Sequence, residues 1–147
     1  MNFNKTELTM EEVITALYTL IEISEMDIPE KSHYKITKTI KKFNGYLKVF
    51  HKAKDNLIRK YGTRNDLGQT HILHFTDALD SNGKIILDEK KQPTKVENPK
   101  YTEFLKEVQV ELEKTVVIEF ISISIDAFEK TPLTALQLNN LLFMLEA

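Results

Sequence analysis

A basic segment with a regular apolar stripe constrains the fold of this chain most strongly. Residues 31–64 contain eleven lysines and arginines and one acid, Asp55. Apolar residues recur in this segment at steps of four and three, which is the pattern of one face of an α-helix. Because Pro29 and Gly62 stand where helices tend to begin and end, we predict one long helix over residues 30–61. Its stripe comprises Ile36, Ile40, Phe43, Leu47, Phe50, Leu57 and Tyr61.

The charges of the chain are distributed unevenly. Residues 1–30 carry one base and seven acids, residues 31–64 carry eleven bases and one acid, and residues 65–147 carry eight bases and fourteen acids. Such asymmetry is typical of contact with nucleic acid or membranes, and equally of complementary surfaces within one protein. We favour complementary surfaces, because the basic segment lacks a glycine-rich phosphate loop, arginine-rich base readout and a series of exposed aromatic residues.

Two acidic helices are predicted on either side of the basic one. Thr9 and Glu12 form a capping-box signature at the start of the first, which covers residues 8–23. Asn98 is suited to cap the second, which covers residues 99–114. Both helices have an apolar stripe and several glutamates. The economical arrangement is therefore a helical bundle in which the acidic helices neutralise the basic one, and the first two helices form an antiparallel hairpin.

The remaining sequence predicts a small amount of β-structure. Asn82-Gly83, flanked by apolar residues, is a strong signal for a hairpin, which we expect to be an insertion at residues 70–97. Residues 115–125 are rich in β-branched side chains and are predicted to form a strand that pairs with this hairpin. The predicted fold is thus a single α+β domain, mainly α, over residues 1–147.

The last predicted helix is apolar on most of its faces. Thr134 and Gln137 form a second capping-box signature at its start. An apolar surface all round a helix indicates burial in a core or contact with another subunit, and we favour the core. The residues available for an oligomer contact are Leu138, Leu141, Leu142 and Leu145.

The sequence offers little catalytic chemistry. It has no cysteine, no serine in a nucleophile elbow and no glycine motif that cradles phosphate. His71 and His74 lie near Asp77 and Asp80, but residues three apart in a strand point to opposite faces, which argues against a metal site. We expect no catalytic residues, no metal and no cofactor, and hence no enzymatic activity.

Several segments together resemble a family of small proteins of unknown function from tailed bacteriophages and prophages. The segments are "IPEKSHYKITKTIKKF", the helix end "AKDNLIRKYG", "YTEFLKEVQVELEKTVVIEF" and the closing "LTALQLNNLLFMLE". The similarity covers most of the chain outside residues 66–98, where the hairpin is longer than the usual connector of the family. The resemblance implies a viral gene and action through protein contacts, and it brings no functional residues with it.

The leading hypothesis is a non-enzymatic phage protein that acts through protein–protein contacts, as a virion component or assembly factor. One alternative is an inhibitor of a host defence or transcription protein, and another is nucleic-acid binding by the basic helix, residues 31–64. We expect the host cytoplasm or the virion as its location, and no membrane, because no stretch approaches about 18 consecutive apolar residues. The candidate interaction surface comprises Lys35, Lys38, Lys41, Lys42, Lys48, Lys52, Arg59 and Lys60.

Overall fold

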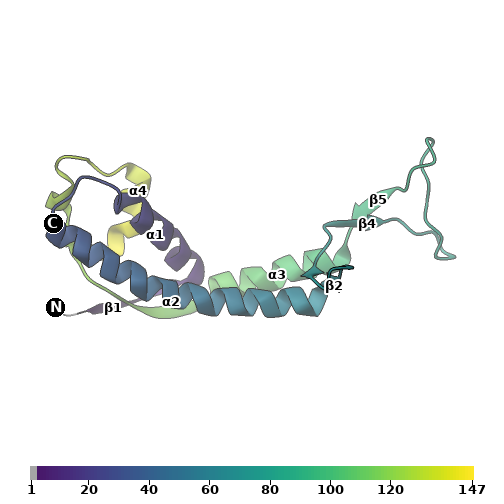
Figure 1. Cartoon of the computed structure of the whole chain (residues 1–147), viewed down its shortest axis with the longest axis horizontal. Helices are drawn as coiled ribbons and strands as arrows, with labels where there is room; N and C mark the ends of the chain where they lie inside the picture. Colours follow the sequence, from purple (N-terminus) through teal and green to yellow (C-terminus); the bar gives the residue numbers. More distant parts are fainter. Residues whose placement is uncertain (1–2) are drawn as a thin grey trace. The chain divides into compact units, whose positions relative to one another are not determined.

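Helices dominate the structure, a computed structural model that describes residues 3–147 (Figure 1). The fold is α+β and mainly α, as predicted, and its sheets have two strands each. The chain divides into two compact units: unit 1 holds residues 3–51 and 111–147, and unit 2 holds residues 52–110. Two of the helices, α2 and α3, contribute residues to both units.

The elements follow one another as helices joined by short strands. The α-helices are α1 (Met10–Ile23), α2 (Glu30–Tyr61), α3 (Pro99–Glu113) and α4 (Ala135–Leu141), with the 3-10 turns η1 (Ile125–Phe128) and η2 (Leu142–Met144). The strands are β1 (Asn4–Thr9), β2 (Thr63–Arg64), β3 (Thr70–His71), β4 (Phe75–Asp77), β5 (Lys95–Glu97), β6 (Thr115–Phe120), β7 (Ile123–Ser124) and β8 (Leu145–Glu146). The pairs β1–β6, β2–β3 and β4–β5 are antiparallel, and β7–β8 is parallel.

Local signals determine where the helices begin. In α1, the Thr9 hydroxyl accepts the Glu12 N–H at 3.2 Å, and the Glu12 carboxylate accepts the Thr9 N–H at 3.0 Å. The same reciprocal pair joins Thr134 and Gln137 at the start of α4. Each box satisfies backbone N–H groups that a helix leaves without an internal partner. The predicted capping boxes are therefore confirmed.

Glycine is needed at the end of α2 because another backbone segment passes close to Gly62. The Gly62 N–H donates to the Ile58 carbonyl at 2.7 Å. A Cβ at Gly62 would lie 2.5 Å from that carbonyl oxygen and 2.7 Å from the His71 carbonyl oxygen of β3. Any larger residue would have to push β3 away from the helix end.

β6 pairs with an N-terminal strand that the sequence analysis missed. β1 runs antiparallel to β6, with Asn4 opposite Phe120 and Thr9 opposite Thr115. The prediction that residues 115–125 pair with the hairpin is therefore wrong, and the strand ends at Phe120. β1 has a mostly polar sequence, and α1, α2 and α3 all lie between it and its partner along the chain. Neither the polar sequence of β1 nor a turn signal could predict that β1 pairs with β6.

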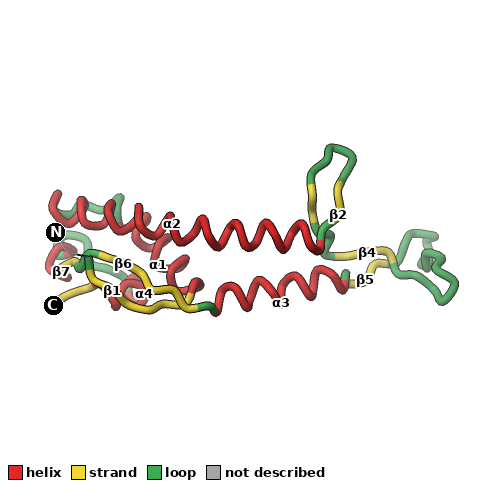
Figure 2. Tube along the Cα trace, turned by 90° about the horizontal axis from the view of Figure 1, so that it is seen from below, coloured by secondary structure: helices red, strands yellow, loops and turns green. Residues whose placement is uncertain are grey.

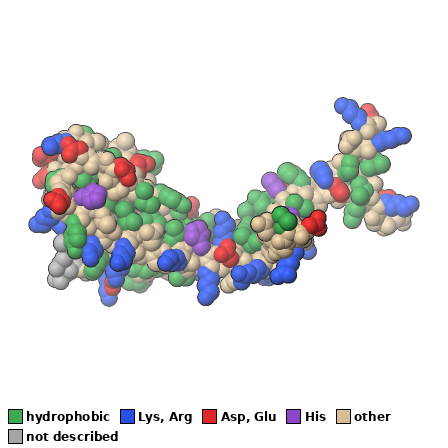
Figure 3. Space-filling view, in the orientation of Figure 1, with side chains coloured by type: hydrophobic (Ala, Val, Ile, Leu, Met, Phe, Trp, Pro, Cys, Tyr) green, Lys and Arg blue, Asp and Glu red, His purple; other side chains and the backbone are tan. Residues whose placement is uncertain are grey.

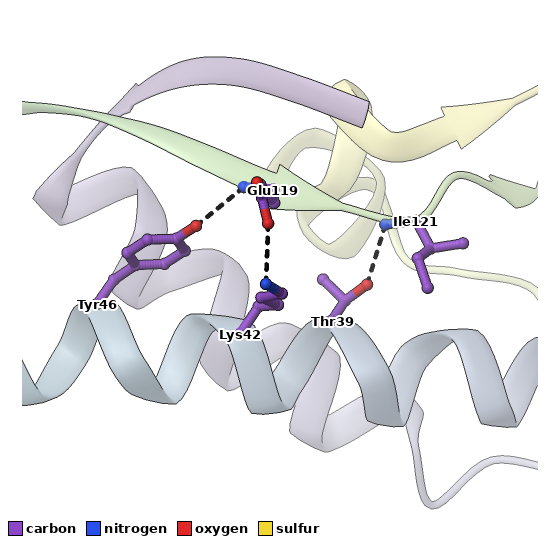
Figure 4. A network of polar contacts seen from close by, with 5 residues as sticks. All are labelled: Thr39, Lys42, Tyr46, Glu119 and Ile121. Atoms are coloured by element: carbon purple, nitrogen blue, oxygen red, sulfur yellow. Dashed lines mark hydrogen bonds and ion pairs between the residues drawn. The ribbon is translucent and has the colours of Figure 1, made fainter. Parts of the chain in front are cut away.

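Side chains of α2 line the edge of β6 that β1 leaves free (Figure 4). The Tyr46 hydroxyl accepts the Glu119 N–H at 3.0 Å, and the Thr39 hydroxyl accepts the N–H of Ile121, the residue that follows β6, at 3.2 Å. The Lys42 Nζ lies 2.9 Å from the Glu119 carboxylate. We call these five residues the polar seam. Unpaired N–H groups at a strand edge tend to recruit other chains. The polar seam supplies acceptors within unit 1 for two such groups, those of Glu119 and Ile121.

Aromatic rings join α2, β6 and η2 in the core of unit 1. Phe43 stacks on Phe143 with ring centroids 6.2 Å apart, and Phe120 meets Phe143 edge to face at 5.3 Å. Phe43 is fully buried, and Ile36 and Phe50 of the same stripe are buried with it. Each such side chain stabilises the fold by about 1.5–3 kcal/mol. Within unit 1 the predicted apolar stripe of α2 therefore faces the core.

Three turns of unit 2 repeat one construction. They span residues 65–69, 80–84 and 88–92, and each begins with an Asn or Asp whose side-chain oxygen accepts the N–H groups two and four residues later. The fourth residue of each turn has a positive φ: 77° at Gly68, 79° at Gly83 and 61° at Lys91. Glycine adopts this conformation freely, whereas Lys91 adopts it against a steric cost.

The predicted hairpin turn at Asn82-Gly83 is confirmed, as part of the turn over residues 80–84. The chain then folds back a second time at residues 88–92 before it reaches β5. The expected insertion, residues 70–97, lies inside unit 2. That the whole chain is one folding domain stays a prediction.

Replacing Thr39 tests the polar seam. Thr39→Val keeps the shape of the buried side chain but leaves the Ile121 N–H without its acceptor. We expect the free energy of unfolding to fall by about 1–3 kcal/mol, measured by urea denaturation followed by circular dichroism. Thr37→Val is the matched control, because the exposed Thr37 hydroxyl donates only to the His33 carbonyl of the same helix. Equal losses in the two variants would contradict the role given to Thr39.

Replacing Lys91 tests the strained turn. Lys91→Gly removes a left-handed cost of about 1–2 kcal/mol, so the turn over residues 88–92 opens less often. We expect several-fold slower hydrogen exchange of the Thr94 N–H, which donates to the Ile86 carbonyl at 2.8 Å. Lys90→Gly is the control: among residues 3–147 the one non-glycine residue with a positive φ is Lys91. Lys90→Gly adds only flexibility and should speed the same exchange, and equal shifts would contradict the account.

Candidate functional site

Most of the basic residues predicted as an interaction surface are exposed. Figure 3 shows lysine and arginine side chains gathered along α2. Of the eleven bases in residues 31–64, two form ion pairs with described residues: Lys42 with Glu119 at 2.9 Å and Lys60 with Glu107 at 3.1 Å. The prediction that glutamates of the same fold neutralise most of this charge is therefore wrong. Exposed members of the predicted surface are Lys38, Lys41, Lys42, Lys48, Lys52, Arg59 and Lys60, and Lys35 is half-buried.

The acidic side chains of α1 do not pair with the basic helix. Glu12 belongs to the capping box, and Glu22 accepts a hydrogen bond from Gln137 of α4. Among residues 3–147 no ion pair joins α1 to α2. α1 packs against α4 instead. The apolar faces decide this arrangement, and the glutamates of α1 remain at the surface.

Three glutamates of α3 form ion pairs, each with a different lysine. Glu107 pairs with Lys60 of α2, which agrees with the prediction that the acidic helices neutralise the basic one. Glu103 pairs instead with Lys106 of its own helix, at 3.3 Å. In unit 1, Glu111 pairs with Lys114 at 2.7 Å. Of Glu103, Glu107 and Glu111, it is thus Glu107 that forms an ion pair with the basic helix.

Packing turns part of the basic helix outward in unit 1. Lys41 and Lys48 precede the buried Phe43 and Phe50 by two positions each. Two residues turn an α-helix by about 200°, so both lysines lie opposite the side that faces the core. Neither forms an ion pair among the described residues. Burial of the apolar stripe therefore decides which lysines meet the solvent.

Lys42 and Glu119 hold each other in their charged forms. The hydrogen bond from Lys42, together with its charge, lowers the pKa of the Glu119 carboxyl below its ordinary value of 4.5. The hydrogen bond and charge of Glu119 raise the pKa of Lys42 above 10.5. The lowered carboxyl pKa stabilises the fold above pH 4.5, and this contribution is lost as the pH falls through the folded value. The raised ammonium pKa contributes below pH 10.5 and is lost as the pH rises through its folded value.

The four C-terminal leucines do not form one surface. Leu141 is fully buried in the core of unit 1, so its predicted role in an oligomer contact is wrong. Leu138 and Leu145 are half-buried. Leu142 is 67% exposed and is available for contact. The helix α4 is short and ends at Leu141, which places the following residues in η2 and β8 and scatters their side chains.

A segment of unit 2 exposes an unusual number of large apolar side chains. We call residues 73–97 the arm; it contains β4, β5 and the turns between them (Figure 2). Within the arm one residue, Ala78, is buried. Exposed large apolar residues of the arm are Leu73, Phe75, Leu79, Ile85, Ile86, Leu87 and Val96. The hairpin was predicted from Asn82-Gly83, but its apolar surface was not, because strand-like apolar runs usually indicate burial.

The histidines do not form a metal site with the neighbouring acids. His74 lies between the rings of Phe75 and Tyr101, at centroid distances of 4.2 and 4.3 Å, and its Nε2 is 3.6 Å from Glu97. The Nδ1 of His71 is buried and has no hydrogen-bond partner among the residues that the structure describes. In residues 3–147 no group of three or more His, Cys, Asp or Glu side chains could hold a metal ion.

Comparisons with known proteins do not extend this description. No protein-family model, no curated protein and no solved structure matches the chain. Within residues 3–147, no helix is both long and apolar enough to cross a membrane. The candidate surfaces of the chain are thus the basic side of α2 and the arm, and the case for each depends on its own residues.

Titration of Glu119 tests the ion pair of the polar seam. We expect the Glu119 carboxyl, followed by NMR, to titrate with a midpoint below 4.5, because Lys42 stabilises the carboxylate. Lys42→Met should move the midpoint upward. Lys41→Met removes a neighbouring lysine outside the polar seam and should leave the midpoint in place. A wild-type midpoint at or above 4.5, or equal shifts in both variants, would contradict the pairing.

Proposed function

We propose that this chain is a non-enzymatic bacteriophage protein that acts through protein–protein contacts, as a virion component or assembly factor. The observation that carries the proposal is the exposed apolar surface of the arm. Large exposed apolar patches on proteins usually mark sites of interaction. The bacteriophage context comes from the sequence resemblance alone.

The arm has little means of supporting itself. Its strands β4 and β5 form a sheet of two strands, and two-stranded hairpins are at best marginally stable in water. Ala78 is its one buried residue. Seven exposed apolar side chains would lose contact with water if a partner covered them. A partner would therefore stabilise the arm and hide its apolar surface in the same step.

The arm also offers backbone groups for pairing. A sheet of two strands has two edges with unpaired N–H and C=O groups, and such edges add strands from other chains. Asp77 at the end of β4 lies opposite Lys95 of β5 and forms an ion pair with it. The first occupant to test is a second copy of the chain, since it presents the same apolar residues and the same edges.

Mass measurement tests the proposal. We expect light scattering to give a multiple of the 17.1 kDa chain mass. The triple variant Leu79→Ser, Ile85→Ser, Leu87→Ser removes apolar side chains that are 59%, 47% and 53% exposed. It should return the protein to 17.1 kDa without loss of helical circular dichroism.

The control removes apolar surface elsewhere. Leu136→Ser with Leu142→Ser changes two residues of unit 1 that are 69% and 67% exposed. This variant should keep the wild-type mass. If it dissociated and the arm variant did not, the interface would lie at the C-terminus. A wild-type chain that is monomeric and absent from virions would contradict the proposal. A stoichiometric host protein captured through the arm would favour the rival role of a host-protein inhibitor.

A further inference from the structure

We propose that the outward side of α2 in unit 1 binds the phosphate backbone of nucleic acid, independently of base sequence. We call this surface the basic face; it consists of the exposed Lys31, Lys38, Lys41 and Lys48, with the half-buried Lys35 at its margin. It lies in unit 1, apart in sequence from the arm, and it does not depend on the function proposed for the arm. Whereas the arm is an apolar surface, the basic face is a charged one.

The charges of the basic face are not neutralised within the fold. None of its five lysines forms an ion pair among residues 3–147. Between Lys31 and Lys54 the chain contains no acidic residue. The nearest carboxylate along the polar seam, that of Glu119, is already paired with Lys42. The basic face therefore presents net positive charge to the solvent, which attracts a polyanion.

The spacing of the lysines suits an extended polyanion. Lys31 and Lys48 are separated by about 25 Å along a helix that rises 1.5 Å per residue. Duplex DNA advances 3.4 Å per base pair, so the same length spans about seven base pairs. All five lysines stand on one uninterrupted helix, which fixes their spacing along the helix axis.

An unexplained glycine lies in the middle of this surface. Gly45 is inside α2, where glycine costs about 1 kcal/mol relative to alanine. Apart from its chain neighbours and the adjoining backbone of α2, no atom of the described residues lies within 4 Å of the position that its Cβ would occupy, so packing against other segments does not require glycine. A shallow hollow at Gly45 is lined by Lys41, Lys48 and His51. A missing side chain between two lysines lets a phosphate backbone approach the helix closely.

The composition of the basic face favours phosphate over an acidic protein. Interfaces between proteins are depleted in lysine and depend on clustered aromatic or apolar anchors. Between residues 30 and 51 the exposed large apolar side chains are Tyr34 and Val49, which stand far apart on the helix. The Tyr34 ring is already covered by the Lys38 ammonium, 5.3 Å from its centroid. A membrane surface fits less well, because the apolar side of α2 that would insert is buried in unit 1.

Salt-dependent binding by the full chain tests the proposal. We would measure fluorescence anisotropy with 24-base-pair duplex DNA, and with duplex RNA of the same length, between about 50 and 200 mM salt. We expect binding at the lowest salt and a negative slope of log K against log salt. Lys38→Gln with Lys41→Gln and Lys48→Gln should reduce the size of that slope by about three, because each lysine that contacts phosphate contributes about one.

Two further variants separate a local site from a general charge effect. Lys84→Gln with Lys90→Gln and Lys91→Gln removes three exposed lysines from the arm and should leave the slope unchanged. Gly45→Leu keeps every charge and replaces glycine by a better helix former, so it should fold at least as well as the wild type. It fills the hollow, and we expect several-fold weaker binding.

The outcomes decide the proposal. Absence of binding to both duplexes at about 50 mM salt would overturn it. So would equal slope changes in the two triple variants, because a general charge effect would then suffice. Equally tight binding of polyglutamate would assign the basic face to an acidic protein instead. If Gly45→Leu left the affinity unchanged, the inference that a phosphate backbone approaches the helix closely at the hollow would be wrong.

Discussion

The closure of the free edge of β6 by α2 is the contact on which the rest of unit 1 depends. β1 pairs with one edge of this strand, and Thr39 and Tyr46 of α2 accept the N–H groups that point from the other. The same rotation of α2 places Phe43 in the aromatic core and leaves Lys41 on the opposite side. The hydrogen bonds to the strand edge and the burial of the apolar stripe thus require the same rotation of α2, and that rotation leaves Lys41 and Lys48 on the free side. A basic helix of this length could otherwise face its neighbours in several rotations.

The helices of this protein could be predicted from sequence because their signals come from residues close together in the chain. The boxes at Thr9 and Thr134 and the apolar stripe of α2 act over a few residues, so their signals lie side by side in the sequence. The pairing of β1 with β6 and the hydrogen bond from Ile121 to Thr39 join residues far apart along the chain, and nothing in either segment identifies its partner. The charge pattern led to the wrong prediction that the acidic helices neutralise the basic one. Opposite charges in neighbouring helices indicate a possible contact, but surface ion pairs contribute only about 0–1 kcal/mol, so apolar burial decides the packing.

The two candidate surfaces differ in the chemistry that each would recognise. The arm offers apolar side chains and open strand edges, which suit another polypeptide. The basic face offers lysines spaced along one helix and a gap at Gly45, which suit a phosphate backbone. The lysines were predicted as an interaction surface and the hairpin as an insertion, but the sequence did not show which lysines lack an ion-pair partner or that the hairpin exposes apolar side chains, since both depend on how distant segments pack. A chain with both surfaces could hold a polyanion through unit 1 and a protein through unit 2.

Hydrogen exchange at the edge of β6 tests the central claim most directly. The N–H groups of Glu119 and Ile121 point away from β1, and the account gives each of them an acceptor on α2. They should therefore exchange as slowly as the N–H groups that pair β6 with β1. Exchange at the rate of an open strand edge, with the rest of β6 still protected, would show that α2 does not close this edge and that its rotation is not fixed by it.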